Sequence, residues 1–159
     1  MTHFIRTVLC LSLALVAGCS SYDGRFAEAS RNDVKRVSPH EGAYSGRWTS
    51  ASHPGGGGNL RCILTKVDGT HSDYRADFHA TWHGFASEHT VVLHTKSAGR
   101  KKAGGVEFEG TSKLRTIIGA GTYTCQGTLD SRTMRACYDA TYDRGTFEVT
   151  RVTPKAGAR

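Results

Sequence analysis

The stretch Asp73–Trp82 reads DYRADFHATW, and its polar and apolar residues alternate at every position. Successive side chains of an extended strand point to opposite faces of the sheet, so this segment has one apolar and one polar face. The apolar face consists of Tyr74, Ala76, Phe78, Ala80 and Trp82. The pattern predicts a β-strand with one side in a core and the other in solvent.

The same period of two recurs along the chain, interrupted by clusters of Gly, Asp, Asn and Ser that are typical of turns. It predicts strands at residues 43–52, 59–67, 73–82, 86–96, 105–114, 120–129, 132–141 and 144–152. Such short loops require antiparallel neighbours. We therefore predict an all-β domain over residues 43–152, an eight-stranded antiparallel up-and-down barrel, because closure removes both unpaired edges. A flattened β-sandwich is the alternative, in which the last strand does not pair with the first.

The first six residues include one basic residue, Arg6, and an apolar run follows from Val8 to Ala17. This run is too short to span a bilayer and is typical of a secretory signal, which we predict over residues 1–18. The sequence LVAGC that ends at Cys19 resembles the lipobox of bacterial lipoproteins. The resemblance implies that acyl chains on Cys19 anchor the protein in a membrane of the bacterial cell envelope. In such lipoproteins Ser20, rather than Asp, after the cysteine implies the outer membrane and a domain that faces the periplasm.

Two segments flank the predicted barrel. Residues 19–42 are polar and mixed in charge, which indicates a lipidated cysteine followed by a flexible tether, with one short helix possible from the spacing of Phe26, Ser30 and Val34. Residues 153–159 are predicted to be a disordered tail. The formal net charge of +7 is spread along the chain, and the densest run, Arg100–Lys102, lies between glycines as at a hairpin tip. We therefore expect no nucleic-acid partner, because nucleic-acid binders concentrate their charge on one face.

Three cysteines belong to the predicted barrel. Cys125 and Cys137 flank the turn at Asp130–Arg132, and a register centred on Ser131 would place them opposite each other in a disulfide, which export permits. The alternation of apolar residues instead turns Cys137 outward. A bridge between Cys62 and Cys125, or free buried thiols, are the alternatives.

The sequence offers no catalytic motif that we can identify, and we expect neither an enzyme nor a cofactor. Gly55–Gly58 is not followed by the Lys and Ser or Thr of a phosphate-binding loop, and there is no strained serine elbow. His79 and His83 share a strand face with Asp77, but they lie about 13 Å apart, too far to bind one metal ion. We expect no metal site there and predict a solvated face.

His89 falls on the inward face, where a buried imidazole needs a hydrogen-bond partner such as Tyr74 or Tyr138. It is either a core histidine or part of a ligand pocket, since such pockets are mostly apolar with a few polar groups. The candidate lining is Trp48, Trp82, Tyr74, Tyr138 and His89. A small apolar ligand inside the barrel is the first functional hypothesis. The alternative is a structural or protein-interacting envelope lipoprotein whose barrel is filled by its own side chains.

Gly46-Arg47-Trp48 resembles the Gly-x-Trp start of lipocalins and other calycins. The resemblance implies that Trp48 plugs the closed end of the barrel and that Arg151 packs over it. More of the chain resembles a family of small uncharacterised bacterial lipoproteins, to which no activity is attached. The residues that carry this second resemblance are Tyr44, Gly46, Trp48, Leu60, Cys62, Tyr74, Ala76, Phe78, Phe108, Gly110, Gly121, Tyr123, Tyr142, Asp143, Gly145 and Phe147.

Overall fold

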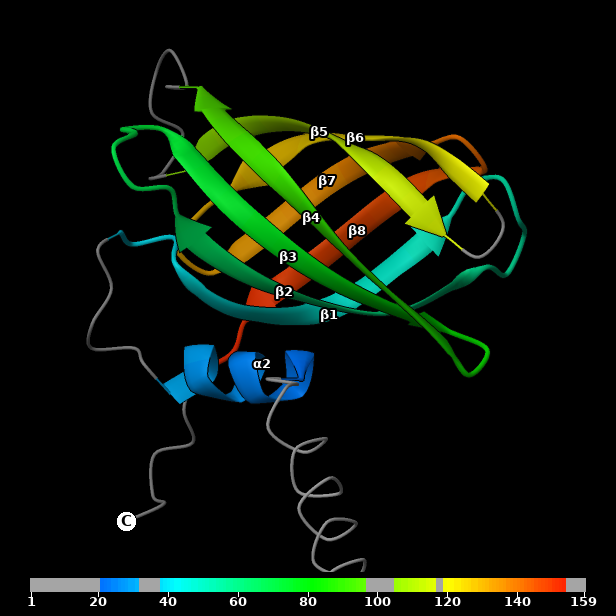
Figure 1. Cartoon of the computed structure of the whole chain (residues 1–159), viewed down its shortest axis with the longest axis horizontal. Helices are drawn as coiled ribbons and strands as arrows, with labels where there is room; N and C mark the ends of the chain where they lie inside the picture. Colours follow the sequence, from blue (N-terminus) through cyan, green and yellow to red (C-terminus); the bar gives the residue numbers. More distant parts are fainter. Residues whose placement is uncertain (1–20, 32–37, 97–104, 117–118, 154–159) are drawn as a thin grey trace, which may run out of the picture.

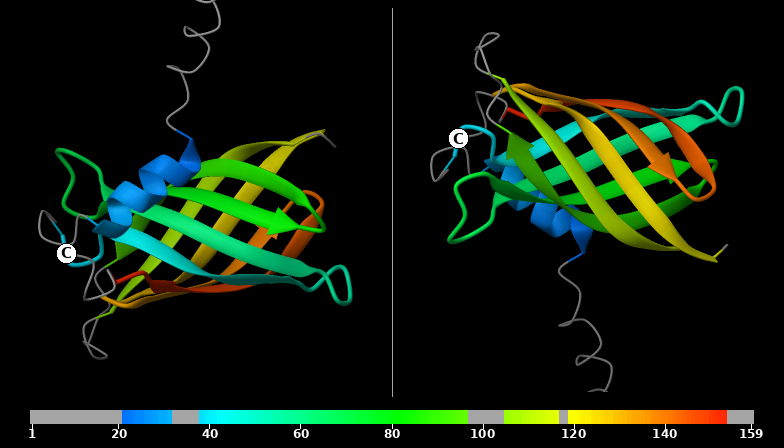
Figure 2. Two further views of the ribbon diagram at one scale, coloured as in Figure 1. Left: turned by 90° about the horizontal axis from the view of Figure 1, so that it is seen from below. Right: turned by 90° about the horizontal axis from the view of Figure 1, so that it is seen from above.

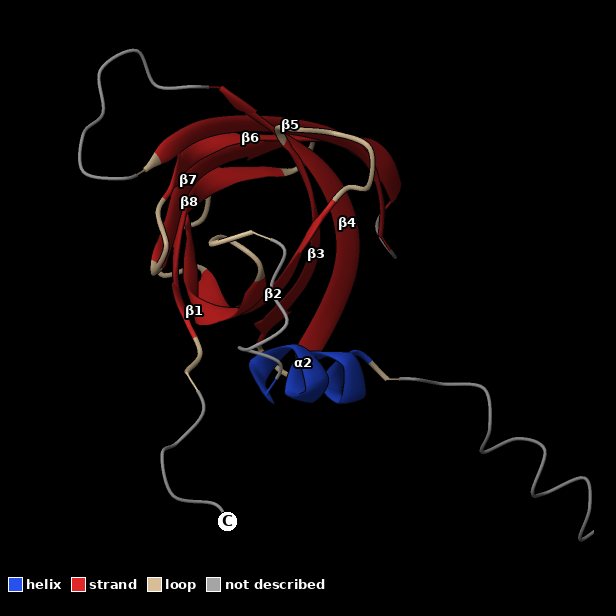
Figure 3. Ribbon diagram, turned by 90° about the vertical axis from the view of Figure 1, so that its left-hand side faces the viewer, coloured by secondary structure: helices blue, strands red, loops and turns tan. Residues whose placement is uncertain are grey.

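The computed structural model describes residues 21–31, 38–96, 105–116 and 119–153. Eight antiparallel strands form a closed barrel in sequence order (Figure 1). They are β1 (Gly42–Ser50), β2 (Gly57–Lys66), β3 (Asp73–Trp82), β4 (Phe85–Lys96), β5 (Val106–Thr116), β6 (Gly119–Leu129), β7 (Thr133–Ala140) and β8 (Asp143–Arg151). The last strand pairs with the first over seven positions from Tyr44–Arg151 to Ser50–Gly145, so the predicted barrel is confirmed and the sandwich is excluded. Figure 3 shows the ring of strands from one end.

The inward faces follow the predicted alternation. In β3, Tyr74, Ala76 and Phe78 are at most 5% exposed, and the inward residues of the other strands join them in one core. The half of the barrel where β1 begins is filled by large aliphatic side chains that are at most 2% exposed: Leu64, Leu93, Leu129, Met134 and Val149. We call this half the closed end, and the opposite half, where β1 ends, the open end.

At the closed end, Arg151 of β8 binds the residues at the start of β1 and just before it. Its guanidinium donates hydrogen bonds to the carbonyl oxygen of Glu41 at 2.7 Å and to the hydroxyl of Tyr44 at 2.8 Å, and it stacks on the Tyr44 ring at 5.2 Å. The prediction that Arg151 packs over Trp48 is therefore wrong. Arg151 pairs with Tyr44 in the sheet, and Trp48 lies four residues further along β1, about 13 Å away towards the open end. The expectation that Trp48 plugs the closed end is therefore also wrong.

A helix, α2 (Tyr22–Arg31), lies against the outer wall of the barrel beside β1 and β2 (Figure 2). Tyr22 is only 5% exposed, stacks on His79 at 4.9 Å and donates a hydrogen bond to the carbonyl oxygen of Asp77 at 3.2 Å. Arg25, on the same face of the helix, forms an ion pair with the Asp77 carboxylate at 3.1 Å. The interval predicted as a flexible tether thus contains a docked helix. The predicted solvated face of β3 is wrong at Asp77, which is 8% exposed beneath it.

The predicted disulfide between Cys125 and Cys137 is wrong. Cys125 pairs with Tyr138, and Cys137 pairs with Gln126, so the two sulfurs lie on opposite faces of the sheet. The register is centred one half-residue beyond Ser131, because Leu129 pairs with Met134, and such a slip exchanges the two faces. Cys62, Cys125 and Cys137 are all free. Burial raises the pKa of Cys62, and that of Cys125 to about 12, so both buried thiols stay protonated at neutral pH.

Several predictions concern residues outside the described part of the chain: the signal at 1–18, Cys19, the Arg100–Lys102 tip and the tail beyond residue 153. Within the described residues, no helix has the length and apolar character needed to cross a bilayer.

Candidate ligand-binding site

The open end of the barrel contains a cavity of about 480 Å³, a volume in the range of small-molecule sites. Aromatic and imidazole rings from six strands dominate its wall: Trp48, Phe78, Trp82, His89, Tyr123, Tyr138 and Phe147. Four of the five predicted lining residues are therefore brought together, namely Trp48, Trp82, His89 and Tyr138. The cavity exists because inward positions at this level carry small residues, Ala80, Ser87 and Ala140, where the closed end carries Leu and Met.

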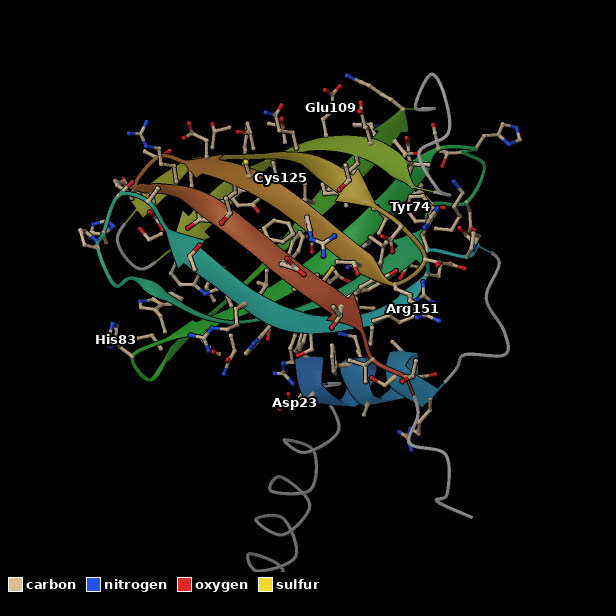
Figure 4. The ribbon with its side chains drawn as sticks, turned by 180° about the vertical axis from the view of Figure 1, so that it is seen from behind. Asp23, Tyr74, His83, Glu109, Cys125 and Arg151 are labelled. Carbon is tan, nitrogen blue, oxygen red and sulfur yellow. The ribbon has the colours of Figure 1, made fainter. Side chains whose placement is uncertain are left out.

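Tyr74 does not line the cavity. Its hydroxyl is hydrogen-bonded to the Ser38 hydroxyl, and the ammonium of Lys66 lies over its ring at 4.6 Å, both at the closed end. Figure 4 shows Tyr74 and Arg151 towards one end of the barrel and His83 at the other. The prediction of Tyr74 as a lining residue is wrong because alternation gives the face of a residue but not its level along the barrel. Eight residues separate Tyr74 from Trp82, about 26 Å of extended strand.

Trp48 is the centre of the aromatic wall. Its ring meets those of Trp82 and Tyr138 edge to face, each at a centroid distance of 6.4 Å, a favourable arrangement for aromatic pairs. Its indole nitrogen donates a hydrogen bond to the carbonyl oxygen of Thr81 at 3.4 Å. The strand partner of Trp48 is Gly58, where a Cβ atom would come within 1.6 Å of that same carbonyl oxygen. β2 therefore begins at Gly57, two residues before the predicted strand at 59–67, and Gly58 is a strand residue that lets β2 approach β3 beneath the indole.

A hydrogen-bonded group fastens the mouth of the cavity. The Tyr138 hydroxyl donates to one oxygen of Asp143 at 2.8 Å, and the Ser50 hydroxyl donates to the other at 2.6 Å. Burial, followed by the bond to Asp143, raises the pKa of the Tyr138 phenol. The three residues come from the ends of β7, β8 and β1, so these hydrogen bonds connect three strands at the rim. They also satisfy the polar atoms of the three side chains.

His89 makes neither of the predicted hydrogen bonds to Tyr74 or Tyr138. Its ring stacks on Phe78 at 5.2 Å and meets Tyr123 edge to face at 4.7 Å. Its Nε2 atom is buried and has no hydrogen-bond partner among the described residues. Burial lowers the pKa of His89 from 6.5 to about 4, so the imidazole is neutral at physiological pH.

Two exposed aromatic residues at the open end are absent from the predicted lining. Phe85, the first residue of β4 and the strand partner of Trp82, is 58% exposed and approaches the Trp82 ring at 6.3 Å. Tyr142, in the turn before β8, is 48% exposed and lines the mouth. Phe85 lies one residue before the predicted strand at 86–96, and alternation assigns a turn residue such as Tyr142 to neither face.

Comparison with protein-family models, curated proteins and solved structures finds no match for this chain. Within the described ranges, no group of three or more His, Cys, Asp or Glu side chains is placed to hold a metal ion. The candidate site therefore rests on its own geometry, which is that of an apolar pocket open at one end.

Proposed function

We propose that this protein is a lipid-anchored lipoprotein of the outer membrane, facing the periplasm, that binds a small apolar ligand in the open end of its barrel. The observation that carries the binding proposal is the cavity of about 480 Å³ with its wall of aromatic rings. A barrel whose role was only structural would gain stability from filling this space, because unfilled volume costs packing energy. Large aliphatic side chains fill the closed end of the same barrel, which supports the view that the open end is kept hollow for an occupant.

The two tryptophans of the chain, Trp48 and Trp82, both line the cavity, so intrinsic fluorescence reports on its occupancy. Titration with N-phenylnaphthylamine is expected to quench their emission through energy transfer to the bound probe. Ala80→Phe places a ring in the cavity, since Ala80 lines it, and should abolish the quenching. The matched control is Val92→Phe on the outer face, where Val92 is 41% exposed, and this variant should bind like the wild type. Equal binding by both variants, or no binding by the wild type, would contradict the proposal.

The membrane anchor is supported by the sequence LVAGC before Ser20 and by the basic and apolar leader that precedes it. Stable attachment requires two or more acyl chains, which a lipidated Cys19 would provide. Cys19→Ala is therefore expected to leave the protein uncleaved or soluble on membrane fractionation. Cys137→Ala is the control, since Cys137 is an exposed thiol of the barrel, and it should fractionate with the membrane. A normally processed Cys19→Ala protein in the membrane fraction would refute the anchor.

A further inference from the structure

Three polar groups at the rim of the cavity already have partners within the protein. Tyr138 and Ser50 both donate to the Asp143 carboxylate, and the Trp48 indole donates to a backbone carbonyl. A ligand that displaced any of these bonds would have to replace it, because a buried polar group that loses its partner is costly. These groups shape the pocket and have little need of a ligand.

His89 is different, because its ring lines the cavity while its Nε2 atom, which the surrounding side chains cover, has no hydrogen-bond partner in the described structure. A ligand group that bonds to this nitrogen must displace one of the covering side chains. The ring is held between Phe78 and Tyr123 by the contacts described above, so its orientation is fixed by packing on two strands. Position and orientation are therefore set before any ligand arrives, which lowers the entropic cost of a hydrogen bond to it.

The scarcity of charged side chains in the cavity favours an uncharged ligand. Of the described residues that line the cavity, none is Lys or Arg, and the one carboxylate, Asp143, is engaged at the rim. His89 is neutral because burial lowers its pKa to about 4. Apart from the imidazoles of His53 and His83 at the mouth, the described lining thus offers no counter-charge to a ligand carboxylate or ammonium group, which would be buried at a high desolvation cost. A neutral imidazole offers one donor and one acceptor nitrogen, so it suits a neutral group that can act as either.

We infer that the cavity selects an uncharged, largely apolar ligand with one hydrogen-bonding group, such as a hydroxyl, and that His89 binds this group. The inference rests on the proposed binding function and adds the ligand class and the residue that recognises it. His89 is here a specificity determinant, while the aromatic wall supplies affinity for any apolar molecule of suitable size.

The test uses two probes that differ only in the hydroxyl, naphthol and naphthalene, with affinities measured by isothermal titration calorimetry at neutral pH. The wild-type protein is expected to bind naphthol about tenfold more tightly than naphthalene, the ratio given by one good neutral hydrogen bond. His89→Phe keeps an aromatic ring between Phe78 and Tyr123 but removes both nitrogens. This variant should bind naphthalene at least as well as the wild type and lose the preference for naphthol.

Tyr138→Phe is the matched control, because it removes a hydroxyl from the same wall that is already bonded to Asp143. This variant should preserve the ratio of the two affinities, whatever its effect on their absolute values. His89→Leu is a second variant, for the case that the phenylalanine packs poorly. Circular dichroism verifies that both variants fold into the barrel. A wild-type preference that survives in both His89 variants, or a wild type without preference, would overturn the inference. Failure of the wild type to bind either probe would instead refute the proposed function itself.

Discussion

The two ends of the barrel are made by the same eight strands with the same alternation, yet one is filled and the other is hollow. At the closed end, inward positions carry side chains such as Leu64, Leu93 and Met134, which are at most 2% exposed. At the open end, inward positions include Ala80 and Ala140, and the rings around them enclose the cavity. Alternation thus decides which residues face inward, whereas the volume of the residues at each level decides whether the interior is core or pocket.

A matched pair of leucine truncations tests this difference most strongly. Leu93, at the closed end, is fully buried, and Leu93→Ala should lower the free energy of unfolding by about 2–5 kcal/mol because it opens a new cavity. Leu114 is only partly buried and already borders the cavity. Leu114→Ala should cost about 1 kcal/mol, since it removes apolar contact but creates no separate void. Urea unfolding followed by circular dichroism measures both, and equal losses would mean that the open end is packed as tightly as the closed end.

Acidification should destabilise the open end through His89. Its pKa is about 4 in the folded protein and 6.5 in the unfolded chain, so the unfolded state binds a proton first as the pH falls. The stability linked to this group is therefore fully present above pH 6.5 and is lost progressively down to about pH 4, by about 3 kcal/mol in total at about 1.4 kcal/mol per pKa unit. Phe78 and Tyr123, which pack against the ring, carry no charge in this range.

His89→Phe separates this effect from the protonation of carboxylates, because the carboxylates are the same in both proteins. The difference in unfolding free energy between wild type and variant should shift by the stated amount between pH 7 and pH 4. Parallel stability curves across this interval would show that His89 is as accessible to protons in the folded barrel as in the unfolded chain.

At the closed end, Arg151 should matter for stability and not for ligand binding. Arg151→Met keeps an apolar stem but loses the hydrogen bonds to the Glu41 carbonyl and the Tyr44 hydroxyl, at an expected cost of about 2 kcal/mol. Arg151→Lys should recover only part of this, since an ammonium cannot reproduce the planar fork or the stacking on Tyr44. Hydrogen exchange at residues 42–44 measures the loosening. A reduced affinity for N-phenylnaphthylamine in either variant would show that the two ends are not independent.

The sequence was sufficient for the architecture because a period of two and short turns constrain a β-barrel strongly. Eight strands, their order and the inward set all follow from local pattern. The docked helix was harder to predict, since Tyr22 and Arg25 hold it to the barrel through contacts with Asp77 and His79, which are distant in sequence. Nothing in the alternation of β3 distinguishes an outer face that meets water from one that meets a helix.

The sequence was sufficient to predict which residue types line the candidate site, but not the level of each residue along the barrel. Trp48, Trp82, His89 and Tyr138 were correctly grouped because all are inward, and Tyr74 was wrongly added for the same reason. Depth depends on the register of every strand pair, and the cysteines show how sensitive that is: half a residue at the Asp130–Arg132 turn separates a disulfide from two free thiols.

The smallest expected effect concerns the hairpin that joins β3 to β4 at the open end. His83 and Gly84 both have positive φ, 44° and 83°, as in the two-residue turns that match the twist of a β-hairpin. His and Asn both adopt the left-handed conformation more readily than most residues, but Asn before Gly is the pair preferred in these turns. His83→Asn should therefore stabilise the protein by about 0.5–1 kcal/mol, measured by thermal or urea unfolding.

His53→Asn is the control for that substitution, because His53 also lies at the mouth of the cavity but has no positive φ. It should leave the free energy of unfolding nearly unchanged, and an equal gain in both variants would exclude backbone conformation as the cause. Because the turn borders the mouth without filling the cavity, His83→Asn should stabilise the hairpin while the affinity for N-phenylnaphthylamine stays within about twofold of the wild type, which is less than half a kcal/mol. A larger loss would show that the imidazole of His83 takes part in closing the open end over its ligand.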